Sequence, residues 1–562
     1  MADILFVTPN YKTNILEIPL GSLLLGTILR QNGMDVALTS FSEFGPATPF
    51  EDFLRKGVER ISREEPKIVS FYTRCDSYHI ALKLAQRLKA AMPRVWIVFG
   101  GPQADITAQE TVCSFPYVDF VCCGEGEHTV YPLFSSLLKE TPDLDIPGLV
   151  YCKDGQPVKN PRPVLMENLD LLPIVDYSLV QTVDTEGQDF PVDVGRGCPF
   201  GCTYCSTNTF WGRKYRLKSP ERIVEDILDV HQRFGFASFA FEHDMFTMKR
   251  SQVEKTCELL KKLDFQVRWR CSARVDCIDR QLIDTMVDAG MYAIYIGIET
   301  GSAVMQKKIN KNLKLEQVLP MLSYIHSKGV KVTTSFIYGF PEETREEVGQ
   351  TMELMRSIMA LGNITVQSHL CTFLPGTELT RQYAEHLTPM TTYSNITGDV
   401  AVEECQDLIK EYPQIFLHFR EYTTPIRQEL QYFGHFMWIF NYRFLVYDYL
   451  AKHLGGDLYR MYLDFVSANG QIPWKYSELV LSDRFPESVT DAPMHDLVKD
   501  ICKLWRMERS VKPGQSAIDV FSFNPNQLSK VKDLNELKRG MFILSIQSNP
   551  DGIVTRTVRG RA

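Results

Sequence analysis

At 562 residues the chain exceeds what one hydrophobic core normally serves, so about three domains of ~150–200 residues are expected. Its net charge of −8, with a pI near 5.9, offers no basic field for a phosphate backbone, so no nucleic-acid partner is expected. Scattered cysteines, no basic segment at the start and no apolar run of ~20 residues predict a cytoplasmic protein with no membrane span.

Residues 1–150 alternate strands with helices and are predicted to form an open, Rossmann-like domain of the α/β class. The expected strands are Ile4–Thr8, Ile68–Tyr72, Val95–Phe99 and Val118–Cys122, and the expected helices are Leu20–Gln31 and Ile80–Ala91. This alternation predicts a parallel, doubly wound sheet, whose ligand lies at the carboxyl ends of the strands.

Two glycine-rich turns follow strands of this domain, at Gly100-Gly-Pro102 and Gly124-Glu-Gly-Glu127. The absence of side chains there would let the backbone approach a large ligand. A dinucleotide is the alternative ligand, but the G-x-G-x-x-G sequence that opens the first helix of dinucleotide-binding folds is missing.

Cys198, Cys202 and Cys205 form a C-x₃-C-x₂-C run after the next strand candidate. Three thiolates can hold three irons of a [4Fe–4S] cluster and leave the fourth iron open to a ligand. The alternatives are a zinc site or three unlinked buried cysteines. Zinc usually requires a further Cys or His at close spacing, yet no histidine lies between His128 and His231.

Residues 190–385 continue the alternation and are predicted to form a partial (βα)₆ barrel. Its expected strands are Pro191–Val194, Ala237–Glu242, Val267–Ser272, Tyr292–Ile298, Val332–Tyr338 and Thr365–Phe373. In such barrels the chemistry lies at the carboxyl ends of the strands. The polar residues predicted to stand there include Glu242, Asp244, Arg274, Glu299 and Ser335.

Residues 386–562 are predicted to form a mostly helical extension with a small mixed module. Aromatic residues are concentrated in Glu411–Tyr422 and Gln431–Phe444, and stripes of this kind are more often packed core than cofactor site. Three strands are expected near the end, at Ala517–Phe523, Phe542–Gln547 and Ile553–Val558, with a turn at Asn549–Gly552.

The cysteine run, within Gly195-Arg-Gly-Cys-Pro-Phe-Gly-Cys-Thr-Tyr-Cys-Ser206, resembles the signature of the radical S-adenosylmethionine (radical SAM) superfamily. Together with Pro19–Gly26 and the two glycine turns, it resembles the cobalamin-binding branch of that superfamily over about residues 1–385. The resemblance implies a [4Fe–4S] cluster on the three cysteines, SAM on its open iron, and cobalamin on the N-terminal domain. It implies a cobalamin-binding domain over 1–150, a linker over 151–189, the barrel over 190–385 and a C-terminal domain over 386–562.

The resemblance also implies the residues that contact SAM. These candidates are Tyr204, Glu242, Asp244, Arg274, Glu299 and Ser335. Glu242 or Asp244 would meet the amino group of SAM, Arg274 its carboxylate and Glu299 its ribose, while the backbone of Tyr204 would meet the adenine. A local ion pair with Asp276 is the alternative for Arg274.

The candidates for cobalamin contact lie on three turns of the N-terminal domain. They are Thr73, Arg74, Cys75, Gly100, Gly101, Pro102, Gly124, Glu125, Gly126 and Glu127. The D-x-H-x-x-G sequence that supplies a histidine to cobalt in other cobalamin folds is absent, and His79 has the wrong spacing, so cobalamin is expected to bind without histidine ligation. Arg74 would disfavour axial coordination because a guanidinium has no lone pair to donate; the alternative is an exposed loop cation.

The function implied by the resemblance is methyl transfer. One SAM would methylate cob(I)alamin, and a second would give the 5′-deoxyadenosyl radical, which takes hydrogen from an unactivated carbon before that carbon accepts the methyl group of methylcobalamin. The electron would come from a flavodoxin- or ferredoxin-type donor. No catalytic side chain is assigned, and Tyr338 and Tyr295 are candidates for substrate contact.

The segment Glu411–Phe419 resembles the tails of family members that modify ribosomally made peptides, so a precursor peptide is the expected substrate. A lipid, a nucleoside and an antibiotic intermediate are the alternatives. A second possible function keeps both cofactors but performs cyclisation, ring contraction or oxidation without net methyl transfer. A third is a non-enzymatic cobalamin or redox sensor, against which the set of SAM candidates argues.

Overall fold

The computed structural model describes residues 2–11, 19–41, 44–45, 47–180, 189–390, 400–442, 448, 457–469, 499–500, 503, 516–523, 539–548 and 554–561. The chain divides into two compact units. The first comprises Met1–Gly297, Gln306–Val332 and His369–Thr423, and the second comprises Ile298–Met305, Thr333–Ser368 and Thr424–Ala562.

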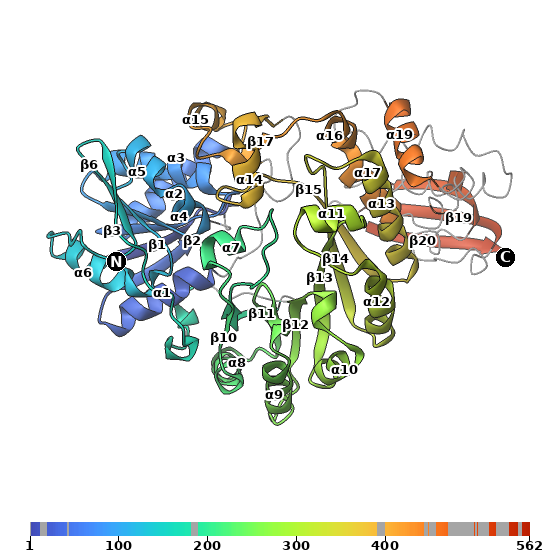
Figure 1. The fold of residues 1–562 in the computed structure, drawn as a ribbon, viewed down its shortest axis with the longest axis horizontal. Helices are drawn as coiled ribbons and strands as arrows, with labels where there is room; N and C mark the ends of the chain where they lie inside the picture. Colours follow the sequence, from blue (N-terminus) through green and yellow to red (C-terminus); the bar gives the residue numbers. More distant parts are fainter. Residues whose placement is uncertain are drawn as a thin grey trace. The chain divides into compact units, whose positions relative to one another are not determined.

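A seven-stranded sheet forms the centre of the N-terminal domain (Figure 1). Its strands are β1 (Ile4–Thr8), β2 (Val36–Ser40), β3 (Ile68–Tyr72), β4 (Trp96–Gly100), β5 (Phe120–Cys122), β6 (Leu149–Lys153) and β7 (Gln156–Lys159), in the order β2-β1-β3-β4-β5-β6-β7. The first five are parallel, whereas the hairpin of β6 and β7 is antiparallel and extends into the segment predicted as a linker. The direction in which successive strands are added to the sheet reverses between β1 and β3. Sheets of this kind bind ligands at the carboxyl ends of the strands at that point.

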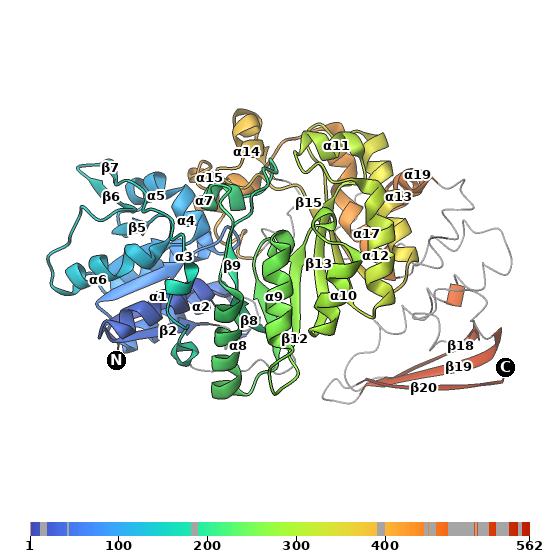
Figure 2. The same ribbon diagram turned by 60° about the horizontal axis from the view of Figure 1, so that its bottom comes forward.

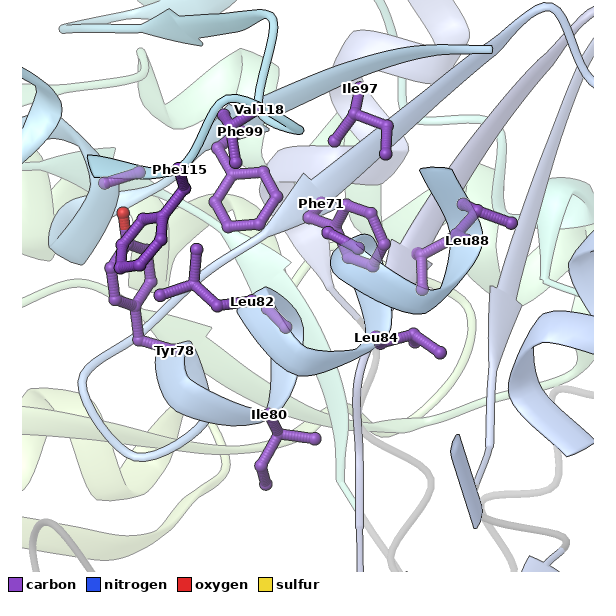
Figure 3. Packing of buried hydrophobic residues seen from close by; sticks show 14 of the residues in the cluster. Phe71, Tyr78, Ile80, Leu82, Leu84, Leu88, Ile97, Phe99, Phe115 and Val118 are labelled. Atoms are coloured by element: carbon purple, nitrogen blue, oxygen red, sulfur yellow. The ribbon is translucent and has the colours of Figure 1, made fainter. Parts of the chain in front are cut away.

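Helices cover both faces of this sheet, which confirms the doubly wound fold. They are α1 (Leu20–Gln31), α2 (Phe50–Arg63), α3 (Tyr78–Ala91), α4 (Pro102–Ile106), α5 (Ala108–Ser114) and α6 (Val130–Leu138). On one face Phe6 packs 6.1 Å from Phe134 of α6, measured between ring centroids. On the other face Phe71 and Phe99, 5.1 Å apart, pack against Leu82 of α3 (Figure 3). Burial on both faces explains why the strands are continuously apolar.

A segment from far along the chain completes the second of these faces. Phe416 and Phe419 belong to the same buried cluster as Tyr78 and Phe99. Two hydrogen bonds fasten the segment: the Gln103 side chain donates to the carbonyl of Ile415 at 2.9 Å, and His79 Nε2 lies 2.8 Å from the carbonyl of Val400. The prediction that Glu411–Tyr422 is packed core is confirmed for its buried aromatics.

All six strands predicted for the barrel are present. They are β8 (Phe190–Asp193), β11 (Ser238–Glu242), β12 (Arg268–Ala273), β13 (Met291–Glu299), β14 (Lys331–Tyr338) and β15 (Ile364–Leu370), in the order β15-β14-β13-β12-β11-β8. The helices between them are α8 (Pro220–Phe234), α9 (Arg250–Leu260), α10 (Arg280–Asp288), α11 (Ala303–Lys308), α12 (Val318–Ser327) and α13 (Arg345–Ala360). The pairs β8/β11, β11/β12 and β12/β13 are parallel, as the prediction requires.

The C-terminal part of the second unit contains helices and a small sheet. The helices include α16 (Pro425–Glu429), α17 (Phe433–Tyr442) and α19 (Leu458–Asn469). The three predicted strands form an antiparallel sheet of β18 (Ser516–Phe523), β19 (Arg539–Ser548) and β20 (Val554–Arg561) (Figure 2). The predicted turn at Asn549–Gly552 lies outside the described residues. Among the helices that the structure describes, none has both the length and the hydropathy to cross a membrane.

A buried carboxylate lies between β14 and α13. One oxygen of Glu343 accepts the backbone N–H groups of Gly339 and Phe340, at 2.6 and 3.3 Å, and the other oxygen is buried and finds no hydrogen-bond partner among the residues that the structure describes. Burial raises the pKa of Glu343 from 4.5 to about 8, against the opposing effect of these two backbone bonds and of Arg427. The folded chain therefore keeps this carboxyl group protonated at neutral pH.

This group predicts a pH dependence of stability. The contribution of Glu343 is fully present below pH 4.5 and is lost as the pH rises through 8, because the unfolded chain releases a proton that the folded chain retains. The free energy of unfolding of Glu343→Gln, obtained from thermal unfolding, should therefore exceed that of the wild type at pH 8.5 by on the order of a few kcal/mol, and the difference should shrink toward pH 6. Glu346→Gln, at an exposed site of α13, is the control; equal pH profiles for both variants would contradict the prediction.

Candidate functional site

The cysteine run lies on a loop that a short hairpin closes. β9 (Gly195–Arg196) pairs antiparallel with β10 (Arg216–Leu217), and α7 (Thr207–Trp211) lies between them. A Cβ on Gly195 would lie 2.4 Å from the carbonyl oxygen of Arg216, and one on Gly197 would lie 2.0 Å from that of Lys214. Both glycines before Cys198 are thus required for the two ends of the loop to meet.

The three cysteines are free thiols of intermediate burial. Burial raises the pKa of Cys198 to about 11, with a contribution from the charges of Cys205, Asp244 and Cys202 and against the opposing effect of a backbone hydrogen bond at Phe200. Burial likewise raises the pKa of Cys205. The three sulfurs therefore lie close enough to influence one another, and binding of iron would displace their protons.

This donor set fits a cluster site. It consists of three thiols on one loop, and each iron of a [4Fe–4S] cluster takes one thiolate. Among the described parts of the chain, no three His, Cys, Asp or Glu side chains converge as the ligands of one metal ion would. The assignment of the cluster to Cys198, Cys202 and Cys205 stays a prediction that this chemistry supports.

Of the two carboxylates predicted to meet the SAM amino group, Asp244 lies against the cluster loop. Thr207 Oγ1 donates to Asp244 Oδ1 at 3.1 Å, and burial raises the pKa of Asp244 although Thr207 and the backbone of Gly197 oppose the rise. Glu242 and Asp244 are both exposed side chains, and an oxygen of Glu242 lies 3.6 Å from a nitrogen of Arg270. The position of Asp244 next to Cys205 makes it the better placed candidate.

His243, between these carboxylates, has a structural role that the sequence analysis did not identify. Its Nδ1 accepts the backbone N–H of Met245 at 2.7 Å, and its ring packs 5.1 Å from that of Tyr215. Burial lowers the pKa of His243 to about 4, so the ring is neutral. Because a Cβ on Gly195 would lie 2.7 Å from this ring, His243 is a second reason for glycine at the start of the loop.

Arg274 is held by several groups at once. Its Nε and Nη2 donate to the carboxylate of Asp276 at 2.9 and 2.8 Å, and Nη2 also donates to the carbonyl of Lys311 at 2.9 Å. Its guanidinium lies 3.8 Å from the ring centroid of Phe200, which stands between Cys198 and Cys202 in the sequence. The local ion pair considered as an alternative is thus present, and it orients the guanidinium onto the cluster loop. Contact of Arg274 with SAM stays a prediction.

The remaining candidates of the barrel differ in exposure. Glu299, the last residue of β13, is buried with a φ of +72°, a backbone conformation that costs a non-glycine residue about 1–3 kcal/mol and is concentrated at functional sites. Ser335 is buried in β14, and Tyr204 is partly buried between Cys202 and Cys205. Tyr338 is buried with its ring 4.4 Å from that of Phe433, whereas Tyr295 is 37% exposed.

The turns after β3 and β4 contact each other. Thr73 Oγ1 donates to the carbonyl of Gly100 at 2.9 Å, and a Cβ on Gly101, whose φ is +102°, would lie 2.5 Å from the carbonyl oxygen of Thr73. The steric requirement for glycine at 101 therefore comes from the protein's own backbone. A Cβ on Gly100 would meet no atom of the described residues within 4 Å.

Three other cobalamin candidates form ion pairs with neighbouring side chains. Arg74 pairs with Asp76 at 3.0 Å, and both side chains are about one-third or more exposed, at 41% and 35%. The carboxylates of Glu125 and Glu127 bond to Arg196, at 2.7 and 2.6 Å, instead of facing solvent. Arg196 and Arg216 were not singled out from the sequence, although Arg196 lies within the quoted cysteine motif.

Comparison with known proteins identifies relatives of both the N-terminal domain and the barrel. The family model of the Radical SAM superfamily matches residues 192–355, and that of the B12 binding domain matches residues 14–133. An uncharacterised methyltransferase of Pyrococcus horikoshii is 29% identical over 333 residues, which cover 58% of this chain and 72% of that protein. The hopanoid C-3 methylase of Methylococcus capsulatus is 24% identical over 515 residues, which cover 89% and 93%.

A solved structure has a similar fold. The cobalamin-dependent S-adenosylmethionine radical enzyme OxsB, with aqua-cobalamin and S-adenosylmethionine bound, matches with a TM-score of 0.61 and 15% identity. The match covers 91% of this chain and 76% of that chain. At this identity the likeness is one of fold.

The glycine turn after β4 offers a matched pair of variants. Gly101→Ala should destabilise the N-terminal domain by about 2–4 kcal/mol, because the new Cβ overlaps Thr73 and φ is positive. Gly100→Ala should leave stability within about 1 kcal/mol and should weaken cobalamin binding if Gly100 faces the corrin. Urea unfolding and absorbance titration with hydroxocobalamin measure the two effects. Equal loss of stability in both variants would refute the steric assignment.

Proposed function

The chain belongs to the cobalamin-binding radical SAM enzymes, with a [4Fe–4S] cluster, SAM and cobalamin as cofactors, and from this premise we propose that it transfers a methyl group to an unactivated carbon of its substrate. The observation that carries the proposal is the direct bonding of the Gly124–Glu127 turn to the hairpin of the cluster loop. The cobalamin-binding turns and the cluster loop belong to one compact unit, which suits a reaction in which one cofactor supplies the methyl group and the other activates the carbon. Relatives that are named methyltransferase and methylase support it.

The side chains of this chain would orient SAM and hold its charges. When bound, the cluster and SAM would remove a hydrogen atom from the substrate, and cobalamin would carry the methyl group. Asp244, held by Thr207 beside the cysteines, provides a carboxylate for an amino group, and Arg274, held by Asp276, provides a guanidinium for a carboxylate. Such charge-assisted bonds fix orientation as well as affinity.

The substrate is proposed to be a lipid. The peptide substrate was predicted from the segment Glu411–Phe419, but Ile415, Phe416 and Phe419 are buried, so packing already explains the aromatic character of that segment. A relative that matches 89% of this chain is named for methylation of a hopanoid. A precursor peptide becomes the alternative, and a flavodoxin- or ferredoxin-type electron donor stays a prediction.

The methyl-transfer proposal predicts labelling without any substrate. The protein, purified without oxygen and supplied with iron, sulfide, hydroxocobalamin and a low-potential reductant, is incubated with SAM that carries a deuterated methyl group. Mass spectrometry of the bound cobalamin should find the deuterated methyl group on cobalt. Formation of deoxyadenosine with no label on cobalamin would contradict methyl transfer and favour cyclisation, ring contraction or oxidation.

The cluster assignment predicts the effect of removing one thiol. Cys202→Ala should lower deoxyadenosine formation at least 100-fold, because two thiolates no longer hold a complete [4Fe–4S] cluster in place. Cys113→Ala, which removes an exposed free thiol from α5, is the matched control and should retain the wild-type rate. Unchanged deoxyadenosine formation by Cys202→Ala would exclude this cluster site and with it the enzyme mechanism.

The lipid proposal is tested with the same labelled SAM. Reaction mixtures that contain total lipid or total peptide from the source cells are extracted separately, and products that carry the deuterated methyl group are sought in each fraction. Label in the lipid fraction is expected. Label confined to the peptide fraction would restore the precursor peptide as the substrate.

A further inference from the structure

Two buried arginines stand opposite each other at the closure of the cluster loop. Arg196 of β9 and Arg216 of β10 are cross-strand partners in the antiparallel hairpin. Their side chains are only 10% and 4% exposed. Like charges directly opposite each other destabilise a strand pair, and burial makes the repulsion stronger. The hairpin therefore needs a compensating negative charge.

Glu125 supplies that charge to both arginines. Its carboxylate accepts from Arg196 Nη1 at 2.7 Å, and its two oxygens lie 2.9 and 3.0 Å from Arg216 Nη1. The backbone N–H of Met166 donates to the same carboxylate at 2.7 Å. The Glu125 side chain is 1% exposed, so these bonds form in a region from which water is largely excluded.

The surroundings of the two arginines make them dependent on Glu125 to different degrees. Arg196 has two further carboxylate partners, Glu127 at 2.6 Å and Asp193 at 3.8 Å, and the two guanidiniums lie 5.6 and 5.4 Å from the ring centroid of Trp211. Among the residues that the structure describes, Arg216 has no second carboxylate: its Nη1 also donates to the carbonyl of Met166 at 2.7 Å, while its Nε and Nη2 are buried and find no hydrogen-bond partner there. Arg216 is the charge that loss of Glu125 would leave least compensated.

The turn that carries Glu125 is itself fixed to the other glycine turn. The backbone N–H of Gly124 donates to Asp105 Oδ1 at 3.0 Å, and Arg162 donates to Asp105 Oδ2 at 2.6 Å. Asp105 lies on α4, which begins directly after Gly101. A continuous set of hydrogen bonds therefore joins the turn after β4, the turn after β5 and the β9–β10 hairpin that closes the cluster loop.

We propose that Glu125 is a positioning residue that keeps the cluster loop closed and fixes its cysteines at a set distance from the cobalamin-binding turns. The inference rests on the proposed cluster site at Cys198, Cys202 and Cys205. Glu125 acts by neutralising the repulsion between Arg196 and Arg216, without touching SAM or the cluster. Loss of its charge opens the hairpin and widens the distribution of distances between the cluster and cobalamin.

The test uses the holoenzyme with Glu125→Gln, which keeps the shape of the side chain and removes its charge. Hydrogen exchange of backbone amides in residues 196–217 should become about 10–100-fold faster, the change expected for loss of one charge-assisted hydrogen bond. Pulsed EPR between cob(II)alamin and the reduced cluster should show a broader distance distribution than in the wild type. Neither readout depends on turnover.

Two further variants separate positioning from general loss of stability. Asp119→Asn makes the same chemical change at another partly buried ion pair of the N-terminal domain, with Lys89 at 2.7 Å, and should leave both readouts at wild-type values. Glu125→Gln combined with Arg216→Met removes the uncompensated charge as well as its partner and should restore both readouts toward the wild type.

The outcomes distinguish this inference from the function on which it rests. Wild-type protein without a [4Fe–4S] EPR signal would overturn the proposed function and the positioning role together. A normal cluster signal with equal behaviour of Glu125→Gln and Asp119→Asn would overturn the positioning role alone. Failure of the Arg216→Met combination to restore the readouts would show that charge repulsion is not the mechanism.

Discussion

A buried carboxylate between two buried arginines is the interaction on which the arrangement of this site depends. Charged groups out of water are tolerated only when they are paired, and here the pairing crosses from the turn after β5 to the hairpin of the cluster loop. The pairing therefore does more than offset desolvation. In the role proposed for Glu125, the position of the cysteines depends on the N-terminal domain, because this carboxylate neutralises the repulsion across the hairpin that closes the loop.

Close backbone approaches impose the second set of constraints. Gly195 and Gly197 leave room for the returning strand at Arg216 and Lys214, and Gly101 leaves room for Thr73. These glycines serve contacts within the chain, whereas a Cβ on Gly100 would meet none of the described residues within 4 Å. Glycine motifs near a cofactor site thus combine two physical roles, and only the neighbours of each Cβ position tell them apart.

Most of the fold was predictable because its signals are local. The strands Ile4–Thr8 and Ile68–Tyr72 have the predicted bounds, since apolar runs that end at turns depend on a few adjacent residues. The partners of buried side chains were not predictable in the same way. Glu125 was correctly placed on a strand-end turn, but its bond to Arg196, 71 residues away, depends on how two distant segments approach each other.

The sequence by itself indicated the cofactors, through the resemblance of its cysteine run and glycine turns to a known family, and it determined the order of strands and helices, because apolar periodicity is a property of short segments. Only the tertiary structure decided what the flanking residues do. It buried Phe416 and Phe419 in the core of a domain that begins some 400 residues earlier, and it turned Glu125 toward the cluster loop. The physical reason is that burial and charge compensation depend on neighbours in space, which residue type and spacing along the chain do not specify.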